Sequence, residues 1–106
     1  MMGPWTPVPN FSLATLRGHE GPECYLVEPA SPGKPATWCL ILDHYAKGLG
    51  YQPFVTHDLA SGQFKPGEGF SFPFHFRHGS VIPLTSAEYQ RLEAAYSPGN
   101  SAAPAN

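Results

Sequence analysis

Hydrophobic positions cluster in two neighbouring stretches of the chain. Residues 23–29 (ECYLVEP) and 37–45 (TWCLILDHY) are rich in apolar, aromatic and β-branched side chains, and they flank the turn-forming sequence ASPGKPA. Two such runs around a short turn predict a β-hairpin. Because apolar residues occupy successive as well as alternate positions, we expect both strands in the middle of a sheet that is covered on both faces.

A second hairpin is predicted directly afterwards. Residues 51–59 (YQPFVTHDL) and 63–67 (QFKPG) are joined by the turn sequence ASG, and Gly62 suits the position of positive φ. Pro53 has no N–H to donate to a neighbouring strand, so it indicates an edge strand or a bulge.

The stretch GFSFPFHFRH (69–78) has a phenylalanine at every second position. Successive side chains of a strand point to opposite faces, so this spacing predicts a further strand with its phenylalanines buried on one face. The inward-facing residues would be Phe70, Phe72, Phe74 and Phe76, and the outward-facing ones Ser71, Pro73, His75 and Arg77.

The sequence LTSAEYQRLEAAY (84–96) predicts a helix. Thr85 and Glu88 have the spacing of a capping box, and Tyr89, Leu92 and Tyr96 recur on one helical face. We expect the phenylalanine face of the preceding strand to be covered by this helix face or by the same surface of another subunit, and the sequence SPG to end the helix.

These elements predict an α+β fold of about five mostly antiparallel strands. The sheet would be open or form a part-open small barrel, with the C-terminal helix packed on the Phe face or, alternatively, plugging the barrel. We expect an extended Pro-rich arm at 1–10, a single domain at 11–96 and a flexible tail at 97–106.

Composition narrows the range of partners. Charged residues make up 13% of the 106 residues, about half the usual share, and the net charge is −2. The six basic residues are scattered singly, which argues against binding to nucleic acid or to an anionic membrane. No apolar run is long enough to span a bilayer. We therefore expect a cytoplasmic protein, with a weakly charged surface that favours self-association into a homo-oligomer.

The two cysteines lie on opposite arms of the first predicted hairpin. Cys24 and Cys39 would be cross-strand neighbours. In a cytoplasmic protein we expect two buried, reduced thiols, and a disulfide is the less favoured alternative.

A ligand-binding surface is suggested by four residues. His75 and Arg77 would share the outer face of the Phe strand, roughly 7 Å apart, where they could hold an anionic oxygen. Tyr51 and Trp38 would add aromatic walls to a pocket. His75 and His78, three residues apart, would lie on opposite faces of a strand, so this pair should not chelate one ion. We expect no metal and no cofactor.

Two adjacent carboxylate–imidazole pairs are weak catalytic candidates. Neighbours in a strand face opposite ways, so Asp43 and His44 do not form a dyad by themselves, and neither do His57 and Asp58. Across the sheet, His44 could meet Asp58, or His57 could meet Asp43, in the arrangement of a general base. No nucleophile motif accompanies them.

The function favoured by these patterns is a non-enzymatic binding or interaction module that acts through contact with another protein or with itself. One alternative is a protein that binds a small molecule or anion in an aromatic pocket. The other is a small hydrolase or isomerase that uses a His/Asp pair.

Overall fold

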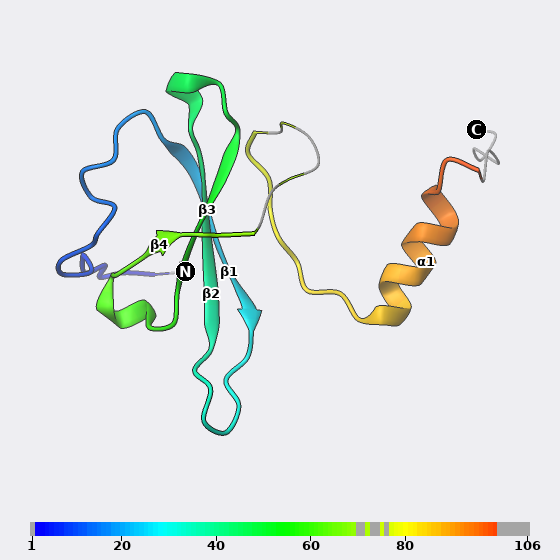
Figure 1. Ribbon diagram of the computed structural model, residues 1–106, viewed down its shortest axis with the longest axis horizontal. Coiled ribbons are helices and arrows are strands. Elements are labelled where there is room, and N and C mark those ends of the chain that lie inside the picture. The colour runs from blue at the N-terminus through cyan, green and yellow to red at the C-terminus, as the bar shows by residue number, and fades with distance from the viewer. Residues whose placement is uncertain (1, 70–71, 73–74, 76, 100–106) are drawn as a thin grey trace.

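The computed structural model describes residues 2–69, 72, 75 and 77–99. Within these residues, four strands form one antiparallel open sheet in the order β1-β2-β3-β4, and a single α-helix follows (Figure 1). The strands are β1 (Glu20–Glu28), β2 (Thr37–Asp43), β3 (Tyr51–Thr56) and β4 (Lys65–Pro66); the helices are α1 (Ser86–Tyr96) and the short 3-10 turns η1 (Tyr45–Lys47) and η2 (Leu59–Ser61). The predicted α+β class and open sheet are confirmed, with four strands among the described residues.

The first predicted hairpin is formed by β1 and β2, which pair antiparallel. Of these two strands only β2 lies in the middle of the sheet, because β1 is an edge strand. The expectation that both strands are central was therefore wrong. The chain before β1 forms local turns, in which the N–H of Ala14 donates to the carbonyl of Phe11, and it offers β1 no further strand.

The second predicted hairpin is formed by β3 and β4. Gly62 has the expected positive φ, 66°, at the end of η2. The strand ends earlier than predicted because Asp58 caps η2 by accepting a hydrogen bond from the N–H of Ala60 at 3.0 Å. Pro53 lies beyond the end of the short β4 ladder, and its carbonyl accepts from the N–H of Gly67 at 2.9 Å.

The two faces of the sheet bury a small core. On one face Cys39, Ile41 and Tyr51 are buried together, and Phe72 packs against Tyr51 with 6.1 Å between ring centroids. On the other face Leu40 and Phe54 are buried.

The two cysteines do not share a face of the sheet. Cys24 pairs with Leu40 in the ladder, so the neighbouring Cys39 points to the opposite side. Both thiols are free, as expected, but only Cys39 is buried. The expectation of two buried thiols was wrong for Cys24, which lies on the edge strand.

The predicted Phe strand falls mostly outside the described residues, which omit 70, 71, 73, 74 and 76. No strand is present at Phe72, His75 or Arg77. Phe72 is partly buried on the sheet, whereas His75 and Arg77 are exposed. The expected alternation of the four rings therefore stays a prediction.

Helix α1 has the predicted capping box, in which the N–H of Glu88 donates to the Thr85 hydroxyl at 3.2 Å and the N–H of Thr85 donates to the Glu88 carboxylate at 2.8 Å. No residue of α1 is buried. The expected packing of the helix on the Phe face was wrong, because the segment before the helix carries it away from the sheet (Figure 1). Within the described ranges, no helix has the length and apolar character that a membrane span requires.

Candidate functional site

Three polar side chains meet at one end of the sheet. In the strand register Glu20 of β1 is opposite Asp43 of β2, and Asp43 is opposite Tyr51 of β3. Directly opposed residues of antiparallel strands share a face, so the three side chains form a row on the face that carries the Ile41 core. The segment that begins at Arg77 lies over this row.

Four residues form what we call the charged cluster: Glu20, Asp43, Arg77 and His78. The guanidinium of Arg77 donates from Nε to Asp43 Oδ2 at 2.7 Å and from Nη2 to Glu20 Oε1 at 2.8 Å. The imidazole Nε2 of His78 lies 3.2 Å from Glu20 Oε1 and 3.6 Å from Asp43 Oδ2. One cation thus bridges two carboxylates, with a histidine beside both.

The two carboxylates of the cluster differ in exposure. Asp43 is 0% exposed, whereas 43% of the Glu20 side-chain surface is accessible. A buried carboxylate requires a cation and hydrogen-bond donors to offset the loss of water. Arg77 meets that need at Oδ2, while Oδ1 of Asp43 has no hydrogen-bond partner among the residues that the structure describes. The hydrogen bond to Asp43, followed by the attraction of its charge, raises the pKa of Arg77.

The backbone after the cluster is fastened to the same end of the sheet. The N–H of Gly79 donates to the hydroxyl of Tyr51 at 2.9 Å, and the N–H of Val81 donates to Glu23 Oε1 at 3.2 Å. Arg77 and His78 are therefore held in place by their own side chains and by the chain that follows them.

The position of the His78 ring depends on a glycine in β1. A Cβ atom on Gly21 would lie 2.7 Å from His78 Cδ2, closer than van der Waals contact allows. Gly21 also has a φ of 57°, and His78 itself has a φ of 50°. A side chain at position 21 would therefore both strain the backbone and displace the imidazole.

The cluster also has the donor types of a metal site. Glu20, Asp43 and His78 each offer one ligand atom, and these atoms lie within 4.8 Å of one another. Carboxylate oxygen and imidazole nitrogen suit a divalent ion such as zinc. The guanidinium of Arg77 is bonded to the same carboxylates, so it supplies the positive charge there, and an ion would have to displace it.

The predicted catalytic pairs do not form across the sheet. His44 directs Nδ1 to Gln52 Oε1 at 3.1 Å and stacks on His19 with 4.0 Å between ring centroids. His57 and Asp58 follow the other end of β3, where Thr56 is paired with Trp38. The antiparallel register separates the two pairs by the length of a strand, so only Asp43 of the four belongs to the cluster.

The predicted ligand-binding residues are also divided. Arg77 and Tyr51 meet at the charged cluster, whereas Trp38 lies at the opposite end of the sheet. His75 is exposed and makes no hydrogen bond or ion pair to the cluster within the described part of the chain. The expected His75–Arg77 surface is replaced by contacts of Arg77 with carboxylates from the first two strands.

Sequence reasoning missed Glu20 as a site residue and considered His78 only as a possible metal ligand. Extending the regular register of the hairpin places Gly21 opposite Asp43, and a register shift between Glu20 and Glu23 brings Glu20 there instead, so the hairpin pattern carries no direct signal for Glu20. The ion pairs with Arg77 had no signal either, since they join positions that are 34 and 57 residues apart.

Comparison with known proteins adds one finding. Residues 5–90 match the model of a family related to glycosyl hydrolase family 43, described as a probable glycosyl hydrolase domain. No curated protein and no solved structure matches the chain. The matched range covers most of the chain, with the whole sheet and all four residues of the charged cluster, so the protein belongs to this family of probable glycosyl hydrolase domains.

Proposed function

We propose that the chain is a carbohydrate-binding unit of the glycosyl hydrolase type, and that it holds a sugar at the charged cluster. The observation that supports this most is the convergence of Glu20, Arg77 and His78, all partly exposed, within a range that matches a glycosyl hydrolase family. Sugar hydroxyl groups both donate and accept hydrogen bonds. A carboxylate, a guanidinium and an imidazole side by side offer both kinds of partner.

Each residue has a distinct part in this proposal. Glu20 accepts hydrogen bonds from sugar hydroxyls, because its carboxylate remains accessible beside Arg77 and His78. Asp43 is buried and binds no sugar; it holds Arg77 in place through the hydrogen bond to Oδ2. Tyr51 and Glu23 fix the chain at Gly79 and Val81, which keeps His78 over the strand ends.

Hydrolysis is the second candidate function, and the exposure of Glu20 favours it. In glycoside hydrolysis one carboxylic acid gives a proton to the departing glycosidic oxygen, while a second carboxylate activates water or attacks the sugar. Glu20 is placed for the first task. Asp43 is the neighbouring carboxylate, but Arg77 covers it, so the second task requires either that Arg77 moves or that another carboxylate approaches.

The two candidates are separated by one set of variants. We expect the chain to bind neutral oligosaccharides from a glycan panel, and Glu20→Gln to weaken that binding at least about tenfold, as loss of a hydrogen bond to a charged group does. Titration calorimetry measures the binding. A panel of p-nitrophenyl glycosides measures turnover, which Glu20→Gln should lower by roughly 100-fold or more if Glu20 is the acid.

The matched control is Glu28→Gln. Glu28 is on the same strand and is similarly exposed, but its partner is Lys34 at 2.6 Å rather than the cluster. Binding and turnover should be unchanged in this variant. Equal binding by the wild type and both variants, or no binding to any sugar of the panel, would show that the cluster does not hold carbohydrate.

A further inference from the structure

In the described part of the chain, two apolar surfaces are incompletely covered. The first, which we call the apolar groove, is a hollow of about 280 Å³ on the sheet face that carries the Ile41 core, toward the end away from the charged cluster. Its walls include Tyr25, Val27, Thr37, Cys39, Pro53 and Val55. Val27 remains 52% exposed, although it is a β-branched residue in a strand.

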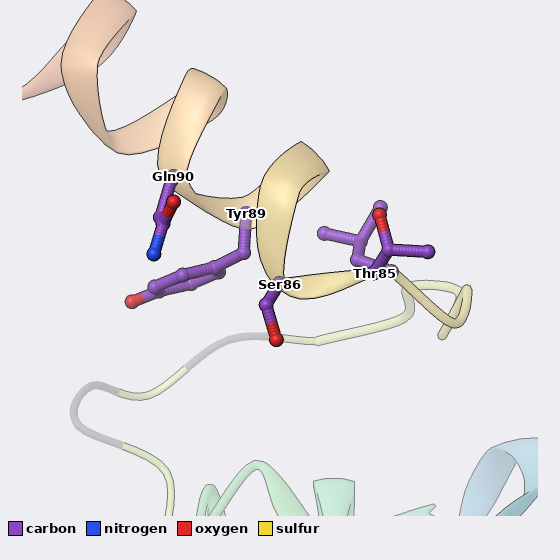
Figure 2. A pocket seen from close by; sticks show the side chains of 5 residues that line it. Thr85, Ser86, Tyr89 and Gln90 are labelled. Carbon is purple, nitrogen blue, oxygen red and sulfur yellow. The ribbon is translucent and has the colours of Figure 1, made fainter.

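The second apolar surface is on the helix. Tyr89, Leu92 and Tyr96, which we call the helix stripe, are 54%, 45% and 81% exposed. Figure 2 shows the start of α1, where Tyr89 projects from the helix into an open hollow lined by Leu84, Thr85, Ser86 and Gln90. The helix stands apart from the sheet (Figure 1).

A helix of this size needs a surface to pack on. Helix α1 has 11 residues, and isolated helices shorter than about 12–15 residues are marginal in water even with good sequences. The capping box contributes, but most helical stability in proteins comes from burying an apolar face. The helix stripe is such a face, and within this chain it is unburied.

The chain exposes more surface than a compact protein of its mass. The chain exposes 8451 Å², whereas a compact protein of the same mass exposes about 5,800 Å². Its radius of gyration is 17.3 Å, against about 13 Å for a compact chain of this length. This extended shape agrees with a helix that does not pack on the sheet of its own chain.

We propose that two copies of the chain exchange their helices, so that the helix stripe of each copy packs into the apolar groove of the other. A two-fold contact of this kind buries the helix stripe and the apolar groove of both copies. It leaves the charged clusters at the ends of the two sheets away from the grooves, where they remain accessible. This interface is independent of the sugar-binding function proposed above.

The attachment of the helix favours a second copy as the occupant of the groove. The chain before α1 is fastened at Gly79 and Val81 beside the charged cluster, at the end of the sheet opposite to the groove. Between Val81 and the helix remain four residues, one of which is Pro83, and they lead the helix away from the sheet (Figure 1). A second copy can meet both surfaces without any change in this connection.

Sedimentation equilibrium and light scattering of the full chain test the proposal. The wild type should have twice the mass of the 11.5 kDa chain, and Leu92→Glu in the helix stripe and Val27→Lys in the apolar groove should each be monomeric. Ala94→Glu is the matched control, because position 94 is about 200° around the helix from Leu92. This variant should remain dimeric. Circular dichroism confirms that each variant retains the sheet.

Mixing the two monomeric variants identifies the geometry. The Leu92→Glu chain retains an intact groove and the Val27→Lys chain an intact helix stripe, so an equimolar mixture should form heterodimers with one of the two contacts restored. The proposal would be overturned if the wild type is monomeric at all concentrations. The groove would then be filled by the chain's own helix or by a different protein. A dimer that both variants leave unchanged, or a mixture that stays monomeric, would also overturn it.

Discussion

The sheet and helix α1 are stabilised in opposite ways. The sheet depends on contacts between distant parts of the sequence, such as the bond from Arg77 to Asp43 across 34 positions and the bond from Val81 to Glu23 across 58. Helix α1 depends on its capping box, which joins Thr85 and Glu88 three residues apart. Long-range contacts order the sheet and the charged cluster together, whereas the contacts that hold the helix within one chain are local.

This difference also separates the two proposed activities. The charged cluster takes residues from two strands and from the segment after the sheet, so it exists only when the strand register is correct. The helix stripe lies on one local element and can change partners without disturbing the cluster. Variants that damage one region should therefore leave the other intact, and the predictions below test that separation.

The largest effect is expected from Ile41→Ala. Ile41 is 1% exposed and lies at the centre of the core, so truncation should lower the free energy of unfolding by about 2–5 kcal/mol. Urea denaturation measures the loss. Leu26→Ala is the control, because Leu26 is 45% exposed and should cost much less. Equal losses from the two substitutions would contradict the position of the core.

A smaller effect is expected from Arg77→Met, which leaves the buried carboxylate of Asp43 without its cation. We expect the melting temperature to fall by roughly 5–10 °C, because an uncompensated buried charge is destabilising. The double variant that adds Asp43→Asn removes the charge as well, so it should recover a large part of the loss in thermal melts. A double variant as unstable as the sum of both single ones would show that the ion pair is unimportant.

The sequence predicted those features that depend on neighbouring residues. Turn residues located both hairpins, and the spacing of Thr85 and Glu88 located the helix and its cap. Gly62 was correctly assigned a positive φ, since the turn geometry leaves few alternatives. These signals act within a few residues, so no knowledge of the tertiary structure is needed to interpret them.

The charged cluster could not be predicted in the same way. Arg77 and Tyr51 were identified as ligand-binding candidates and Asp43 as a catalytic one, so the residues of this region were divided between two sites. To predict that they lie together, one must know the strand register and the path of the segment that follows the sheet. Arg77 was expected to hold an anion together with His75, which is close in sequence. It binds the carboxylates of Glu20 and Asp43 instead, and the buried Asp43 requires a cation to offset its loss of water.

The smallest effect is expected from Thr85→Ala at the start of α1. Loss of the cap should cost the helix about 1 kcal/mol. Because no residue of α1 is buried in the sheet of its own chain, at dilutions where the chain is monomeric this variant should lower the helical signal in circular dichroism and leave the urea midpoint of the sheet unchanged. Ser97→Ala at the other end of the helix serves as a comparison that leaves the capping box intact. A shift of the sheet midpoint would mean that the helix and sheet are coupled.

Acid should act on the helix through the same cap. The N–H of Thr85, and then its hydroxyl, hold the pKa of Glu88 below its ordinary value of 4.5. A carboxylate whose pKa is lowered by folding stabilises the folded form at pH values above its pKa in the unfolded chain. This contribution is lost as the pH falls through its pKa in the folded chain. The helical signal of the wild type should therefore decrease below about pH 4.5. Glu88→Gln has no charge to titrate at this position, so it should have less helix at neutral pH and change little in acid. A parallel decrease in both proteins would assign the acid response to groups outside the cap.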